Sequence, residues 1–95
     1  MADKMTLDDT IPRPTRSTLL EVAMERRRQD VLWPEQAEDP WTPWLAILTE
    51  EVGEVARASL DYNAEGPADI RSELVQVAAV AVAWVEWLDR REQEK

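Results

Sequence analysis

Residues 74–85 limit the possible folds more than any other stretch of the chain. Apart from Gln76, every residue in this run is apolar, so a helix built from it is hydrophobic on nearly all of its surface. Two further helices in a chain of 95 residues can hardly cover such a helix. We therefore expect an all-α protein whose three main helices form a four-helix-type bundle across a homo-oligomer. The alternative is a monomeric three-helix bundle with a small exposed patch.

Local signals predict a short arm followed by a helical domain. Residues 1–15 have little apolar content and two prolines, which favours a flexible N-terminal arm before a domain at 16–95. Thr18 and Glu21 have the spacing of a capping box, so the first helix is expected over 18–32.

Further signals place the other two helices. Thr42 followed by Pro43 is typical of a helix start and predicts a second helix over 43–62. After the break at 63–66, a third helix should run from residue 67 or 68 to about residue 91. Prolines bracket the segment 34–40, which should be irregular.

Composition excludes several kinds of chemistry. The chain has no Cys and no His, so thiolate chemistry, disulfides and the usual zinc ligands are ruled out. Any metal must be held by oxygen, which favours magnesium, manganese or calcium. The net charge of −9 makes nucleic acid and anionic lipid poor partners. The N-terminus lacks a signal-peptide layout and the longest apolar run has nine residues, so we expect a cytoplasmic protein.

Two predicted helices each carry one acid within an apolar stripe. Glu51 is the charged member of the first stripe and Glu73 that of the second. The stripes, spaced three or four residues apart, are Trp44, Leu48, Glu51, Val55, Ala58, Tyr62 and Ile70, Glu73, Val77, Val80, Trp84, Trp87. A carboxylate in an apolar seam is costly unless it is paired, and two such helices can share one hard cation. The alternative is a solvated acidic helix face.

Three short motifs follow one another along the chain: Trp-Pro-Glu-Gln at 33–36, Glu-Glu-Val-Gly-Glu at 50–54 and Glu-Leu-Val-Gln at 73–76. Their order resembles that of the MazG-like all-α nucleotide pyrophosphohydrolases, most of all the short stand-alone members, many of them carried by bacteriophages. The family pattern is Glu-Glu-x-x-Glu, a gap, then Glu-x-x-Asp. The first half matches in full, and Gln76 stands where Asp is expected. The similarity spans roughly residues 25–89.

The resemblance implies dimers or tetramers that bind Mg²⁺, with Mn²⁺ as a substitute. It also implies cleavage of a nucleoside triphosphate, including non-canonical or modified dNTPs, into the monophosphate and pyrophosphate. Carried over to this sequence, Glu51, Glu54, Glu73 and Gln76 would be metal ligands. Glu50 would be a supporting acid or the catalytic base that orients water, and Trp33 and Gln36 would bind the nucleotide base.

Simpler interpretations remain beside these roles. Trp33 could cap the first helix at the edge of the core, and Gln36 could be an exposed loop side chain. At the level of function, the alternatives are a helical module that binds or sequesters a nucleotide without turnover, and a structural helical dimer whose acids are only surface groups.

Overall fold

The computed structural model describes residues 10–61 and 67–94, and these residues are entirely helical or irregular, with no strand. The three α-helices are α1 (Arg13–Leu32), α2 (Trp44–Leu60) and α4 (Pro67–Gln93), and a short 3-10 helix, η1 (Pro34–Gln36), follows α1. The expected all-α fold with three main helices is confirmed.

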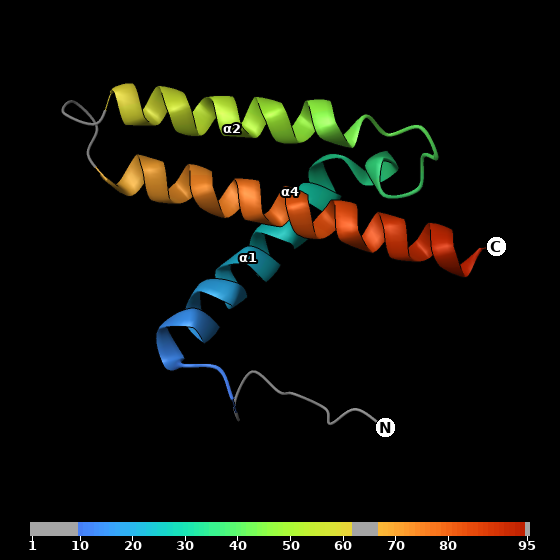
Figure 1. Cartoon of the computed structure of the whole chain (residues 1–95), viewed down its shortest axis with the longest axis horizontal. Coiled ribbons are helices and arrows are strands. Elements are labelled where there is room, and N and C mark those ends of the chain that lie inside the picture. The colour runs from blue at the N-terminus through green and yellow to red at the C-terminus, as the bar shows by residue number, and fades with distance from the viewer. Residues whose placement is uncertain (1–9, 62–66, 95) are drawn as a thin grey trace.

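The central element of the fold is α4. It packs against α2 along one side and against α1 on another, whereas no Cα of α1 lies within 8 Å of a Cα of α2. Figure 1 shows α2 and α4 lying side by side while α1 crosses α4, with the N-terminal half of α1 extending away from the pair. The helix with the longest apolar run is therefore the one that supports both others.

The core lies between α2 and α4. Trp44, Val80 and Ala83 are buried at its centre, and the partly buried residues packed against them are Ile47, Leu48, Trp84 and Trp87. The edge of the Trp44 ring meets the Trp87 ring, with 6.5 Å between their centroids. Both predicted stripes face this seam, because their described members are buried or half-buried. Tyr62 lies outside the described residues.

The first helix begins earlier than expected. It starts at Arg13 rather than Thr18, and Pro14 occupies its first turn, where a missing N–H costs nothing. The Thr18 hydroxyl does not cap a helix end, since it donates to the Pro14 carbonyl oxygen at 3.1 Å. Residues 13–15, expected in the arm, are thus helical; residues 1–9 of that arm lie outside the described residues.

The expected N-cap of the second helix is also wrong. The helix begins at Trp44, and Thr42 instead donates its hydroxyl hydrogen to the loop carbonyl oxygens of Gln36 and Asp39, at 2.6 and 3.0 Å. The segment after α1 is irregular as expected, apart from the single turn of η1. At the other end of the chain, α4 continues two residues past the predicted end, to Gln93.

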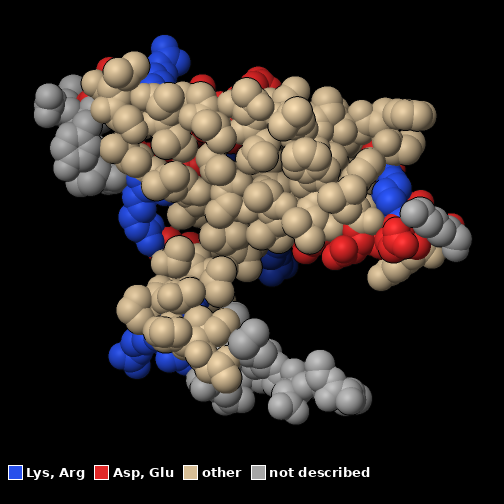
Figure 2. Space-filling model, in the orientation of Figure 1, with Lys and Arg blue, Asp and Glu red and all other residues tan. Residues whose placement is uncertain are grey.

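The two neighbouring helices leave part of α4 uncovered. Its exposed large hydrophobic residues are Leu74, Val82, Val85 and Leu88, and those of α2 are Leu45, Val52 and Leu60. Figure 2 shows that the face over α2 and α4 is mostly uncharged, with acidic and basic side chains toward its edges. None of the helices in the described ranges has the length and apolar content needed to cross a membrane.

Candidate functional site

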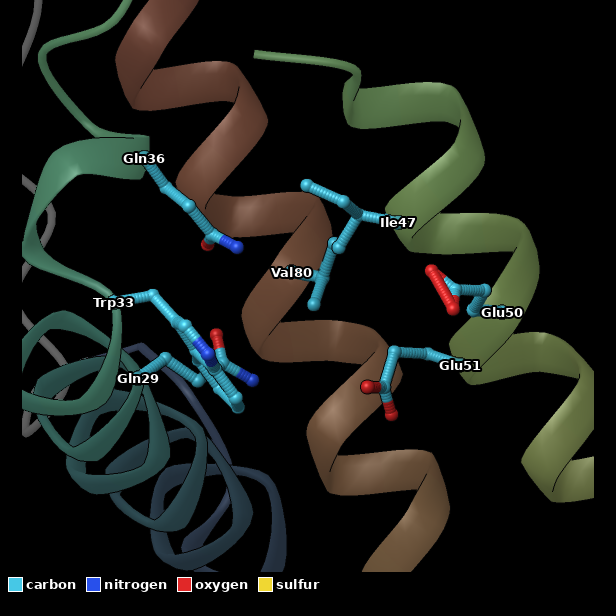
Figure 3. Close-up of a pocket in the computed structure, with 7 residues that line it drawn as sticks. All are labelled: Gln29, Trp33, Gln36, Ile47, Glu50, Glu51 and Val80. Atoms are coloured by element: carbon cyan, nitrogen blue, oxygen red, sulfur yellow. The ribbon is translucent and has the colours of Figure 1, made fainter.

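A pocket of about 260 Å³ lies between α1, η1 and α2, with α4 behind it. Its lining residues are Gln29, Trp33, Gln36, Ile47, Glu50, Glu51 and Val80. Four of the residues predicted as site residues, from separate motifs, therefore share one cavity: Trp33, Gln36, Glu50 and Glu51. Figure 3 shows the ring and amides on the α1 and η1 side and the two carboxylates on the α2 side.

Backbone hydrogen bonds hold Trp33 and Gln36 at the end of α1. The Trp33 N–H donates to the Gln29 carbonyl oxygen at 2.8 Å, which continues the helical pattern by one residue. The Gln36 N–H then donates to the Trp33 carbonyl oxygen at 3.2 Å, closing the turn of η1. The turn thus places both side chains on the pocket side of the loop, in which Pro34 favours the tight conformation.

Three side chains from the C-terminal part of α4 hold the next stretch of this loop. Trp87 Nε1–H donates to the carbonyl oxygen of Asp39 at 2.9 Å. Arg90 and Arg91 donate to the two preceding carbonyl oxygens, those of residues 37 and 38, at 3.0 and 3.3 Å. The Arg91 guanidinium also lies over the Trp87 ring, 4.6 Å from its centroid. We refer to Trp87, Arg90 and Arg91 as the α4 clasp.

Glu51 is the acid most affected by its surroundings. It is half-buried, and its Oε2 atom is buried without a hydrogen-bond partner. Burial raises the pKa of Glu51, and the nearby carboxylates of Glu73 and Glu54 raise it further, with smaller effects from Glu25 and Glu50. A half-buried acid with a buried, unpartnered oxygen and negative neighbours is a group that a cation or a proton would stabilise.

Glu73 faces the same group of acids from α4. Burial raises the pKa of Glu73, and the charges of Glu54, Asp69 and Glu25 raise it as well. Helices α2 and α4 thus bring their two seam acids into electrostatic contact, as the stripes predicted. Within residues 10–61 and 67–94, however, no three acidic side chains converge closely enough to form a coordination group for a metal ion.

The remaining predicted ligands lie outside the pocket. Glu54 is exposed on α2, and neither it nor Glu73 lines the cavity. Gln76 lines a separate shallow hollow with Glu25 and Arg71, on the side of α4 that faces α1. The structure therefore gathers the base-binding candidates with Glu50 and Glu51, and leaves Gln76 apart from them.

Sequence reasoning missed two residues of α1, Gln29 and Glu25. Gln29 lines the pocket and, with 7% of its surface exposed, is buried. Glu25 lies one turn earlier and accepts hydrogen bonds from Gln29 at 3.2 Å and from Arg28 at 2.8 and 2.9 Å. The available signal was their spacing, since Glu25, Gln29 and Trp33 follow one another at intervals of four residues on one helix face.

Comparison of the chain with known protein families, with curated proteins and with solved structures finds no match.

Proposed function

We propose that this protein is a metal-dependent nucleotide pyrophosphohydrolase, which converts a nucleoside triphosphate, including non-canonical or modified dNTPs, to the monophosphate and pyrophosphate. The observation that carries the proposal is the pocket, in which an aromatic ring and amides face two carboxylates across one cavity. The two sides of this pocket suit the two parts of a nucleotide. The ring and amides offer the stacking and hydrogen bonds that a base favours, and the carboxylates could hold a cation to supply the positive charge that phosphates need. The order of the motifs supports the same function by resemblance.

The α1 side of the pocket would receive the base. The Trp33 ring would stack on it, a contact worth about 1–3 kcal/mol. Gln36, which is half-buried at the pocket edge, would hydrogen-bond the edge of the base through its amide. Ile47 and Val80 supply apolar walls between the two ends.

The acids of α2 and α4 would act on the phosphates. Glu51, Glu54 and Glu73 would hold Mg²⁺ or Mn²⁺, because their oxygens suit hard cations and the buried Oε2 atom of Glu51 has no hydrogen-bond partner. When bound, the ion neutralises phosphate oxygens. Glu50, exposed where it lines the cavity, would orient a water and accept its proton. Gln76, one turn after Glu73, can add only a neutral oxygen.

The decisive experiment is pyrophosphate release with Mg²⁺ across a panel of nucleoside triphosphates. We expect turnover of at least one nucleotide by the wild type and its loss in Glu51→Gln. Asp89→Asn is the matched control, because it makes the same chemical change on α4 in a different hollow and should keep full activity. Equal activity in Glu51→Gln and wild type would refute the assignment.

A second candidate is a nucleotide-binding module without turnover. The observation that favours it is the lack, in the described part of the chain, of three acids gathered around one point. Calorimetry with Mg²⁺ and a nucleotide separates the candidates: binding without pyrophosphate release supports the module. If no nucleotide binds at all, the chain is a structural helical protein.

We also propose that the chain forms a homo-oligomer, a dimer or tetramer, in which a second copy completes a four-helix-type bundle. The supporting observation is the exposed apolar surface of α4, where Val85 is 56% exposed. Light scattering at micromolar concentration should give at least twice the mass of the chain, and Val85→Lys should lower it. A stable wild-type monomer would rule out this architecture.

A further inference from the structure

The one buried polar residue among those described is Gln29, and it lies in the wall of the pocket. A buried amide is costly unless its donors and its acceptor are satisfied. The donors are satisfied: Nε2 donates to Glu25 Oε2 at 3.2 Å and to the backbone carbonyl oxygen of Gln76 at 3.4 Å. The amide is therefore tied to both α1 and α4.

These two bonds decide which way the amide points. A carbonyl oxygen can only accept, and Glu25 acts as an acceptor too, since Arg28 donates to both of its carboxylate oxygens. Exchanging the nitrogen and the oxygen of Gln29 would place acceptor against acceptor at both contacts. The orientation with nitrogen toward Glu25 and Gln76 is thus the stable one.

The amide oxygen of Gln29 is consequently left for a ligand. No donor among residues 10–61 and 67–94 bonds to Oε1, this atom is not among the unpartnered atoms sealed from solvent, and Gln29 lines the cavity. Figure 3 shows the Gln29 amide and the Trp33 ring on the same side of the pocket, away from Glu50 and Glu51. A flat ring stacked on Trp33 would therefore present its edge to a fixed hydrogen-bond acceptor.

Such an acceptor distinguishes amino bases from keto bases. The exocyclic amino group of cytosine or adenine projects from the ring and donates directly. In uracil or hypoxanthine a carbonyl oxygen occupies that place, and it would meet the Gln29 oxygen as acceptor against acceptor. Gln36 does not impose this choice, because its amide has no hydrogen bond among the described residues that would stop it from turning either way.

We propose that Gln29 is the specificity-determining residue of this pocket, and that its amide oxygen selects nucleotides whose base carries an exocyclic amino group, as in cytosine and adenine. The proposal rests on the function proposed above, because it assigns the base end of the same pocket. It adds a residue and a substrate class that the motifs do not contain.

The test compares matched pairs of nucleotides, dCTP with dUTP and dATP with dITP, using the full chain and Mg²⁺. We expect the amino member of each pair to be preferred by about ten- to hundredfold in kcat/KM, and in Kd measured by calorimetry. Gln29→Met keeps the length of the side chain without its oxygen, and should bring the ratio close to one. Gln36→Met is the matched control and should weaken both members alike, leaving the ratio unchanged.

Equal treatment of both pairs by the wild type would overturn the proposal, and this comparison stands even if Gln29→Met does not fold. An unchanged preference in folded Gln29→Met would overturn it as well. Binding that prefers the amino member without pyrophosphate release refutes only the hydrolase activity, whereas release without preference refutes only the role of Gln29. Absence of nucleotide binding refutes both.

Discussion

Replacing Trp87 with Phe should loosen the loop that carries Trp33 and Gln36 while preserving the core. The substitution deletes the indole N–H that donates to the Asp39 carbonyl oxygen at 2.9 Å, and it keeps an aromatic ring against Trp44. Of the three donors of the α4 clasp, those of Arg90 and Arg91 would then remain, and the Asp39 carbonyl oxygen would keep only its bonds from Thr42 within the loop.

The expected cost is about 2 kcal/mol. The lost hydrogen bond accounts for about 1 kcal/mol. The smaller ring gives up part of its packing and of its contact with the Arg91 guanidinium, which lies 4.6 Å from the indole centroid; an exposed cation–π contact contributes about 0.5–1 kcal/mol. For a domain of this size the melting temperature should fall by about 8–16 °C.

Hydrogen exchange shows whether the loop is the part affected. Backbone amides of residues 38, 39 and 42 donate within the loop and should exchange faster in Trp87→Phe. Trp84→Phe is the matched control, because it makes the same change three residues earlier, against the same core and without a bond to the loop. If both variants alter loop exchange equally, the clasp does not hold the loop and our reasoning fails.

Three further predictions concern the acids. Glu51→Gln should stabilise the fold at neutral pH, because the raised pKa of Glu51 makes its charged form costly in the folded state. This advantage should shrink as the pH falls through the raised pKa of Glu51 and should be lost below the ordinary pKa of a glutamate; urea unfolding at neutral pH and at that lower pH checks it, and an equal advantage at both contradicts it. Millimolar Mg²⁺ should stabilise the wild type, by about 2.7 kcal/mol at a hundredfold excess over Kd, and so raise its melting temperature. The melting temperature of Glu73→Gln should not change, and equal shifts in both proteins would exclude Glu73 from the cation site. Gln76→Asp should tighten Mg²⁺ binding in calorimetry with unchanged circular dichroism, and an unaltered affinity would remove Gln76 from that site.

The seam between α2 and α4 could be predicted from sequence because its signal is periodic. Residues such as Trp44, Ala58 and Val80 recur at helical spacing, and apolar burial dominates the packing of one helix on another. The same periodicity placed Glu51 and Glu73 in the seam, and the structure brings them into electrostatic contact there.

The helix start at Arg13 and the role of Gln29 could not be predicted in the same way. Thr18 has the residue pattern of a cap, but Pro12 and Pro14 allow the helix to begin five residues earlier, and the hydroxyl then bonds within the helix. Gln29 looks like a surface residue because its partners, Glu25 and the carbonyl oxygen of Gln76, come together only when α1 crosses α4. Local patterns contain no information on such a crossing.

The two walls of the pocket belong to helices whose backbones do not approach each other closely. Among the described residues, α1 and α2 each pack against α4, but no Cα of α1 lies within 8 Å of a Cα of α2. We therefore expect α1 to loosen from α4 while the α2–α4 pair stays folded, as a separate cooperative unit of lower stability. A ligand that reaches from Gln29 to Glu51 would contact both α1 and the α2–α4 pair, and would hold them together. Part of its binding energy would then appear far from the pocket, as slower hydrogen exchange along the whole of α1.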